Sequence, residues 1–193
     1  TSDQFVADAL GDAVSNIYAL AGEGIAALNT GIGWVGSLVA FEGGSGYWLV
    51  ATDEFSFSLN SISSGIIRTR NHVRAVSEIY SFTQSIWQAF FFVKSATITG
   101  ESLEADDIII AYNGDVIVGA RYWNGEFTDV PAMGDDSSLY GEIINEGYCE
   151  TGDGITFKVL DASTANLVSM TAYGNVVWND LAIFIIILEE STK

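Results

Sequence analysis

The first stretch of the chain carries its apolar residues with a helical period. They recur at steps of three and four, which places them on one face of a helix: Val6, Leu10, Ala13, Val14, Ile17 and Leu20. Gly22 and Gly24 follow, and glycines at this place commonly end helices. The pattern therefore predicts a helix over residues 1–21.

From Trp34 onward the apolar residues come in short runs that turn residues separate, which is typical of β-strands. In the first part of the chain we expect strands at 34–41, 46–52 and 55–59. Later strands are expected at 79–82, 87–98, 155–160, 167–172 and 183–188.

The strongest local signal is a hairpin around Asn113 and Gly114. The β-branched run 108–112 precedes this pair and the run 115–119 follows it. Asn and Gly both accept positive φ, so the two residues are predicted to form a tight turn.

The last expected strand is apolar at every position, which suits a strand buried on both faces. It consists of Ile183, Phe184, Ile185, Ile186, Ile187 and Leu188. An apolar strand can also add to the sheet of a neighbour, so these residues are predicted subunit contacts and a candidate donor strand.

A basic segment divides the chain. Arg68, Arg70, His72 and Arg74 alternate at a spacing of two, so they share one face of an extended segment. They are either a solvated linker or a basic strip that contacts the acidic face of another copy. We accordingly predict an N-terminal unit over 1–64, a basic linker over 65–77 and a second domain over 78–193. The fold class is mainly β: a small N-terminal helix-plus-strands unit followed by a larger antiparallel β-sandwich.

The composition and net charge of the chain limit the kinds of partner that it can bind. The 193 residues include 25 Asp and Glu but 7 Lys and Arg, a formal net charge of −18, while 49% of residues are apolar. Five Trp, 8 Tyr and 11 Phe exclude an acidic disordered tail, and the negative charge disfavours nucleic acid. The longest uncharged apolar run, 181–188, is too short to insert into a membrane. An acidic folded β protein of this kind suits an extracellular location in salty water.

The candidate catalytic motifs fail on their context. Gly31 to Gly36 matches G-x-G-x-x-G, but the expected helix and strand stand in the wrong order for a dinucleotide site. The stretch Gly43 to Tyr47 resembles the nucleophile elbow G-x-S-x-G around Ser45, but its fifth position is Tyr. His72, the single histidine, lies among arginines that disfavour its protonation. Acidic residues are so abundant that no glycosidase pair stands out. We expect no enzymatic activity.

Two acidic clusters are candidates for structural Ca²⁺, since this ion prefers oxygen ligands in loops. They comprise Glu104, Asp106 and Asp107, and Asp129, Asp135 and Asp136. Neither has EF-hand spacing, and a solvated acidic surface is the alternative interpretation.

Exposed aromatic residues could stack on a sugar. The candidates are Tyr122, Trp123 and Phe127, beside an expected turn at Asn124 and Gly125. The alternative is that these rings belong to the core.

Two stretches resemble known modules. Trp34-Val35-Gly36-Ser37-Leu38 with Gly46-Tyr47-Trp48 resembles a "W-x-G-S-L … GYW" module, and Ala111-Tyr112-Asn113-Gly114-Asp115 with Val118-Gly119-Ala120-Arg121-Tyr122-Trp123 resembles a β-sandwich module that often follows it. Such tandem modules occur in fibre-like structural proteins of marine phages and in surface proteins of marine bacteria. The first modules usually begin with a further strand, so the resemblance implies maturation, a shorter sequence or a sheet edge that a neighbour completes.

The resemblance implies a scaffold and no catalytic set. The expected function is a non-enzymatic structural subunit of an extracellular assembly, a marine phage virion protein such as a decoration or fibre component. Its partners would be copies of itself or other virion or surface proteins. The alternative is a bacterial cell-surface adhesin or carbohydrate-binding module that binds a host-surface glycan.

Overall fold

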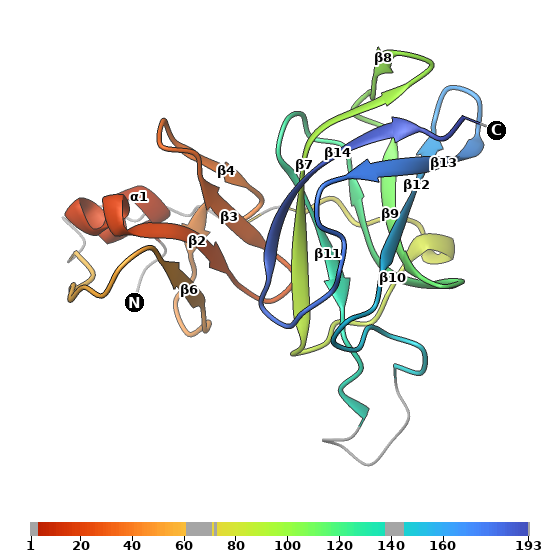
Figure 1. Cartoon of the computed structure of the whole chain (residues 1–193). Helices are drawn as coiled ribbons and strands as arrows, with labels where there is room; N and C mark the ends of the chain where they lie inside the picture. Colours follow the sequence, from red (N-terminus) through yellow and green to blue (C-terminus); the bar gives the residue numbers. More distant parts are fainter. Residues whose placement is uncertain (1–3, 61–70, 72, 138–144, 193) are drawn as a thin grey trace. The chain divides into compact units, whose positions relative to one another are not determined.

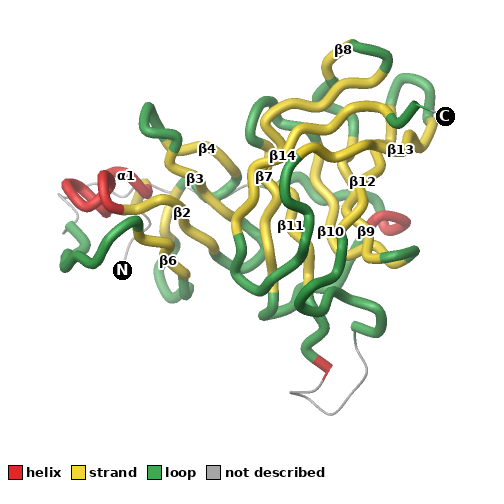
Figure 2. The backbone as a smooth tube through the Cα atoms, viewed as in Figure 1, coloured by secondary structure: helices red, strands yellow, loops and turns green. Residues whose placement is uncertain are grey.

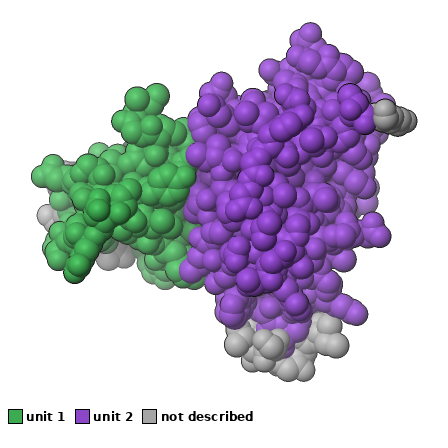
Figure 3. Space-filling model, in the orientation of Figure 1, with its two compact units in different colours: residues 1–73 green, residues 74–193 purple. Residues whose placement is uncertain are grey.

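The chain folds into two compact units, residues 1–73 and 74–193, called unit 1 and unit 2 (Figure 3). The computed structural model describes residues 4–60, 71, 73–137 and 145–192 (Figure 1). The division falls inside the segment 65–77 that was predicted as a linker. The predicted mainly β class is confirmed: short helices and small sheets precede a larger, mostly antiparallel sheet.

The predicted N-terminal helix is much shorter than expected. Strand β1 (Gln4–Phe5) leads into helix α1 (Val6–Leu10), and a 3-10 helix, η1 (Gly11–Asn16), follows. The last part of the predicted helix is strand β2 (Ile17–Ala21). None of the helices among the described residues has the length and apolar character needed to cross a bilayer.

Gly11 explains where the helix stops, because its φ of 54° lies in the left-handed region that only glycine adopts easily. The apolar spacing nevertheless marks a real buried face. Val6, Leu10, Ala13 and Ile17 all lie in the core of unit 1. A periodic pattern thus identified the buried side chains but not the elements that carry them.

The main sheet of unit 1 has four strands in the order β4-β3-β2-β6. All its pairs are antiparallel. The other strands are β3 (Ala26–Asn29), β4 (Trp34–Gly36) and β6 (Trp48–Ala51). A separate two-stranded ladder joins β1 to β5 (Ala40–Phe41).

The predicted strands of unit 1 are partly right. The run 46–52 contains β6, and the run 34–41 divides into β4 and β5. The run 55–59 forms no strand. Phe55 and Phe57 instead stack on one another, with ring centroids 5.3 Å apart.

Unit 2 contains one large mixed sheet that curls into a half-barrel (Figure 2). Its strand order is β10-β9-β12-β13-β14-β7-β11, with β8 added beside β7. Among the strands that the structure describes, the β14–β7 pair alone is parallel, so the predicted antiparallel arrangement holds for the remaining pairs. The strands are β7 (Gln88–Ile98), β8 (Glu101–Ser102), β9 (Ile108–Asn113), β10 (Val116–Tyr122), β11 (Thr128–Met133), β12 (Ile155–Asp161), β13 (Asn166–Tyr173) and β14 (Ile183–Glu190).

Most strands of unit 2 were predicted correctly, but β8 and β11 were not predicted, and one predicted strand is absent. The run 79–82 contains no strand, and η2 (Glu78–Tyr80) is a 3-10 helix there. Tyr80 and Phe82 pack against a small cluster formed by β9 and β10 around Ile110 and Tyr112.

The predicted hairpin is confirmed, but its turn lies one residue further on. Val116 pairs with Asn113, so the two loop residues are Gly114 and Asp115. Gly114 has a φ of 56°, which a two-residue hairpin with Gly in first place requires. Asn113 belongs to the strand, where its side chain donates to Asp153 Oδ2 at 2.9 Å.

The strand buried on both faces is β7 and not β14. Phe90, Phe91 and Phe92 are each 0% exposed, although their side chains alternate between the two faces. On β14, Ile185 and Ile187 are 42% and 36% exposed, so the prediction that this strand is fully buried was wrong. Apolar composition alone does not reveal which strand is covered on both sides.

The core of unit 2 lies inside the curl. Phe91 is at its centre, with the rings of Phe157 and Phe184 at centroid distances of 5.3 and 5.2 Å. Other buried members come from most strands of the sheet: Ala89, Val93, Ile109, Ala111, Val118, Val130, Ala132, Val159, Ile186 and Leu188.

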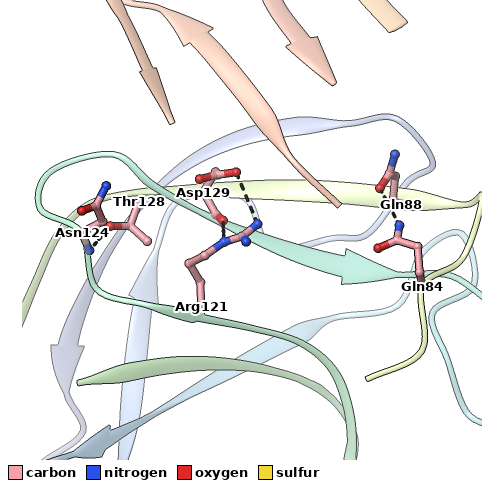
Figure 4. Close-up of polar contacts among 6 residues, drawn as sticks. All are labelled: Gln84, Gln88, Arg121, Asn124, Thr128 and Asp129. Atoms are coloured by element: carbon pink, nitrogen blue, oxygen red, sulfur yellow. Dashed lines mark hydrogen bonds and ion pairs between the residues drawn. The ribbon is translucent and has the colours of Figure 1, made fainter. Parts of the chain in front are cut away.

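The two end strands of the sheet, β10 and β11, lie side by side, so the curl nearly closes. Arg121 on β10 donates from Nε to the Asp129 backbone oxygen at 2.9 Å, and its Nη2 lies 3.5 Å from Asp129 Oδ2 (Figure 4). Both side chains are buried, so each charge has its counterion where water is excluded.

Gly119 and Pro131 make this close approach of the backbones feasible. Pro131 is paired with Phe90, whose N–H donates to Ala182 on the opposite side, so Pro131 turns its nitrogen away from β7 and the ladder loses no hydrogen bond. A Cβ added to Gly119 would overlap the carbonyl oxygen of Pro131.

We therefore expect Gly119→Ala to lower the free energy of unfolding of unit 2 by about 2–3 kcal/mol, since the overlap forces β10 and β11 apart. Urea unfolding followed by tryptophan fluorescence measures this change. Gly154→Ala is the matched control, because its added Cβ meets no atom within 4 Å. Equal stabilities of the two variants would contradict the role given to Gly119.

Candidate functional site: an open strand edge beside an apolar groove

Strand β6 is the most unusual surface element of unit 1, because it is apolar, uncharged and exposed along its whole length. It stands at one end of the four-stranded sheet: β2 lies on one side, and no strand of the described residues pairs with the other side. Trp48, Leu49 and Val50 are 38%, 36% and 36% exposed, and Ala51 is exposed too. Edge strands of monomeric proteins usually carry a charge, a proline or a covering segment.

The register of the sheet shows which backbone groups of β6 point outward. Gly22 donates to Ile25 at the β2–β3 turn, so alternate residues of β2, among them Ala19 and Ala21, turn their backbone groups toward β6. Their partners there are Val50 and Trp48. The N–H and C=O groups of Leu49 and Ala51 therefore point away from β2.

No hydrogen bond joins these outward groups of Leu49 and Ala51 to the residues that the structure describes. Two donors and two acceptors thus stand in a row on an apolar edge. Such a row is the arrangement to which an extended chain adds as a further strand.

A groove of about 660 Å³ lies beside this edge. Leu49 of β6 forms part of its wall, so one face of the edge strand and the groove are one continuous surface. The remaining lining is mainly apolar and includes Leu10, Leu20, Phe41, Tyr47, Phe57 and Leu59.

The Gly-Tyr-Trp motif builds both features. Gly44 adopts a φ of 94° in the turn after β5, and Ser45 donates from its backbone N–H to Glu42 at 3.3 Å. Tyr47 returns to the same turn, where its hydroxyl accepts a hydrogen bond from the Glu42 N–H at 2.7 Å. Trp48 then begins the edge strand.

Aromatic packing and one amide fix the wall of the groove. The rings of Phe41 and Tyr47 meet edge to face with centroids 4.8 Å apart. Asn71 bridges β5 and its following turn. Its Oδ1 accepts from the N–H groups of Val39 and Ala40, and its Nδ2 donates to the Ala40 carbonyl oxygen and to Glu42 Oε1. The groove is thus preformed, and Ser45, whose nucleophile-elbow motif is incomplete, lies in a turn of its wall.

The predicted basic strip is described only at Arg74. Its Nη1 donates to Asp106 Oδ1 at 2.6 Å, and its guanidinium carbon lies 3.6 Å from the ring centroid of Tyr122. The hydrogen bond to Asp106 raises the pKa of Arg74. Arg68, Arg70 and His72 lie outside the described residues, so their role as subunit contacts stays a prediction.

The predicted donor strand, Ile183 to Leu188, forms most of β14. It pairs with β13 on one side and with β7 on the other. Its backbone is thus used inside its own sheet, and in this fold it is not a free donor. Open backbone positions occur on β6 instead.

The predicted sugar-binding rings do not form an exposed platform. Trp123 is 8% exposed and belongs to the core of unit 2. Arg74 lies over the face of Tyr122. Phe127 is half-buried just before β11, where its N–H donates to the Val93 carbonyl oxygen.

The predicted calcium ligands bind protein groups separately from one another. Asp106 pairs with Arg74, and Asp129 pairs with Arg121. Asp107 is buried and accepts from the backbone N–H groups of Glu104 and Ala162 at 2.8 and 2.9 Å.

The second acidic cluster is engaged in the same way. Asp135 accepts from the Ser137 N–H at 2.8 Å, and Asp136 accepts from Asn145 Nδ2 at 2.7 Å. Across the described ranges, no three His, Cys, Asp or Glu side chains gather so as to hold a metal ion. The described residues therefore assemble neither of the two predicted calcium sites.

Sequence reasoning predicted β6 as a strand but missed its significance. The available signal was an uncharged apolar run, Trp48 to Ala51, which Thr52 separates from two acidic residues, Asp53 and Glu54. Which strands flank it was not available from the pattern, so its edge position became visible only with the sheet order.

Comparison with known proteins adds no relative. No family model matches the chain, and neither a curated protein nor a solved structure resembles it significantly. Any functional argument therefore depends on the residues themselves.

The remaining reactive group, Cys149, lies in the core of unit 2. Burial raises the pKa of its thiol to about 12, so at pH 8 the thiol is protonated as well as inaccessible. Folded protein should react with Ellman's reagent at least about 100-fold more slowly than protein in guanidinium chloride. Fast labelling of the folded chain would show that this part of the core opens readily.

Proposed function

We propose that this protein is a non-enzymatic structural subunit of an extracellular assembly. Among such assemblies, we favour a virion component such as a decoration or fibre protein, because the Gly46-Tyr47-Trp48 and Ala111-to-Asp115 motifs led us to expect a likeness to marine phage structural proteins. The open apolar edge of β6 is the observation that carries the proposal.

The contrast between the two units supports this role. In unit 2 the end strands β10 and β11 lie against each other, which protects their backbone groups. In unit 1 the outward groups of Leu49 and Ala51 on β6 have no partner among the described residues. A feature that would make a monomer prone to aggregate becomes a docking site in an assembly.

The charge distribution supports the same role. A net charge of −18 keeps copies apart in dilute salt, whereas salt water screens this repulsion. The docking edge itself carries no charge from Trp48 to Ala51. The chain can thus be soluble overall and still associate through this one edge.

The proposal predicts that Ala51→Pro prevents assembly. Proline removes the outward N–H of Ala51 and leaves the inward groups of β6 intact, so the fold should persist. Light scattering in about 0.5 M NaCl should give a native mass well above the 20.7 kDa of one chain for the unmodified protein, and that of one chain for the variant. Ala51→Ser is the matched control, since it keeps the N–H and should assemble normally.

Two outcomes would contradict the proposal. An unmodified protein that stays monomeric at every salt concentration would favour a free-standing carbohydrate-binding module, to be tested by glycan screening. Equal assembly of the proline and serine variants would show that β6 is not the docking edge. Circular dichroism of both variants checks that each is folded.

A further inference from the structure

We infer that the partner of β6 is the β6 strand of a second copy, paired antiparallel about a two-fold axis at Val50. This inference rests on the proposed function and names the partner of the same edge. The pairing would join two four-stranded sheets into one continuous sheet across the two copies.

The register follows from the positions of the outward backbone groups. Hydrogen-bonded pairs can form only between residues that point outward, which on β6 are Leu49 and Ala51. Placing Leu49 opposite Ala51 of the second copy uses both residues on both strands. Each of the two resulting pairs exchanges two hydrogen bonds.

Other antiparallel registers that also pair outward residues with outward residues use these backbone groups less well. Centring the pair on Leu49 leaves Ala51 to find a partner beyond the end of β6, at Tyr47. Centring it on Ala51 places Leu49 opposite Asp53 of the second copy, which puts a carboxylate against an apolar side chain. Only the register centred on Val50 satisfies both outward residues within the strand.

Charge also favours this register. It places Asp53 opposite Tyr47 of the second copy and Glu54 opposite Gly46, so no acidic residue faces another across the axis. The strand between them is uncharged. Two copies can therefore approach closely at this edge even though each carries a net charge of −18.

The pairing would bury apolar side chains on both faces of β6. Val50 meets Val50 of the second copy as a non-hydrogen-bonded pair, which brings the side chains closest. Leu49, on the face that borders the groove, comes to lie beside Ala51 of the second copy. Residues that are each more than a third exposed in one chain thereby lose contact with water.

A cysteine at the axis tests the register directly. Because the native Cys149 is buried, Val50→Cys adds one accessible thiol, and mild oxidation should link most of the protein into a covalent dimer. Ile32→Cys is the control, since Ile32 is 99% exposed and lies away from β6. Leu49→Cys alone should link poorly, whereas Leu49→Cys combined with Ala51→Cys should link efficiently.

A charge exchange tests the same contact without a covalent bond. Val50→Lys and Val50→Glu each place like charges opposite one another at the axis, so each should be monomeric in light scattering. Mixing the two should restore a dimer, because Lys then faces Glu. Restoration by the mixture excludes simple misfolding as the cause of dissociation.

The outcomes separate this inference from the proposed function. If Val50→Cys links no faster than Ile32→Cys while the unmodified protein assembles and Ala51→Pro does not, β6 receives a different strand and only this inference is overturned. If Val50→Lys and Val50→Glu remain monomeric when mixed, the two-fold register is wrong. An unmodified protein that never assembles overturns both.

Discussion

Every backbone N–H and C=O group in a β-strand needs a hydrogen-bond partner, and the ends of a sheet are where partners are lacking. The two units of this chain meet that constraint differently. Unit 2 brings its end strands together, so that Arg121 on β10 reaches the backbone and side chain of Asp129 on β11. In unit 1 the edge of β6 remains without such protection among the described residues.

The closure of unit 2 depends on small details of the two end strands. Without a side chain, Gly119 lets the backbone of β10 approach Pro131, and Pro131 sits where its missing N–H is not needed. At the other end of β11, Trp178 donates to the Ala132 carbonyl oxygen at 2.9 Å and packs over Gly134. In the sequence these residues show no sign of a special role. In the fold they determine whether the sheet can curl far enough to protect its edges.

Elements that depend on local residue preferences could be predicted from the sequence. Elements that depend on the order of strands in a sheet could not. The hairpin of β9 and β10 and the long strand β7 were found because their β-branched and aromatic runs and turn residues act locally. Residues 17–21 were predicted as helix because their apolar positions continue the helical spacing, but pairing with β3 and β6 makes them a strand.

The candidate site was hardest to predict, because exposure and pairing depend on which strands are neighbours. Ile183 to Leu188 are more apolar than β6, and composition therefore favoured them as the docking strand. The fold places them between β13 and β7, which uses their backbone internally. Trp123 was a plausible surface ring by its neighbouring turn, but it packs in the core of unit 2.

The high negative charge and the uncharged edge belong to one physical arrangement. Repulsion between acidic surfaces disfavours all contacts between copies in proportion to the charges brought together, and screening weakens this repulsion without abolishing it. Contact at Trp48 to Ala51 brings together a strand without charge, and it would pair backbone groups that have no partner among the described residues. The charge on the rest of the surface thus selects against other modes of association, so that a short strand can serve as a specific interface although its own area is small.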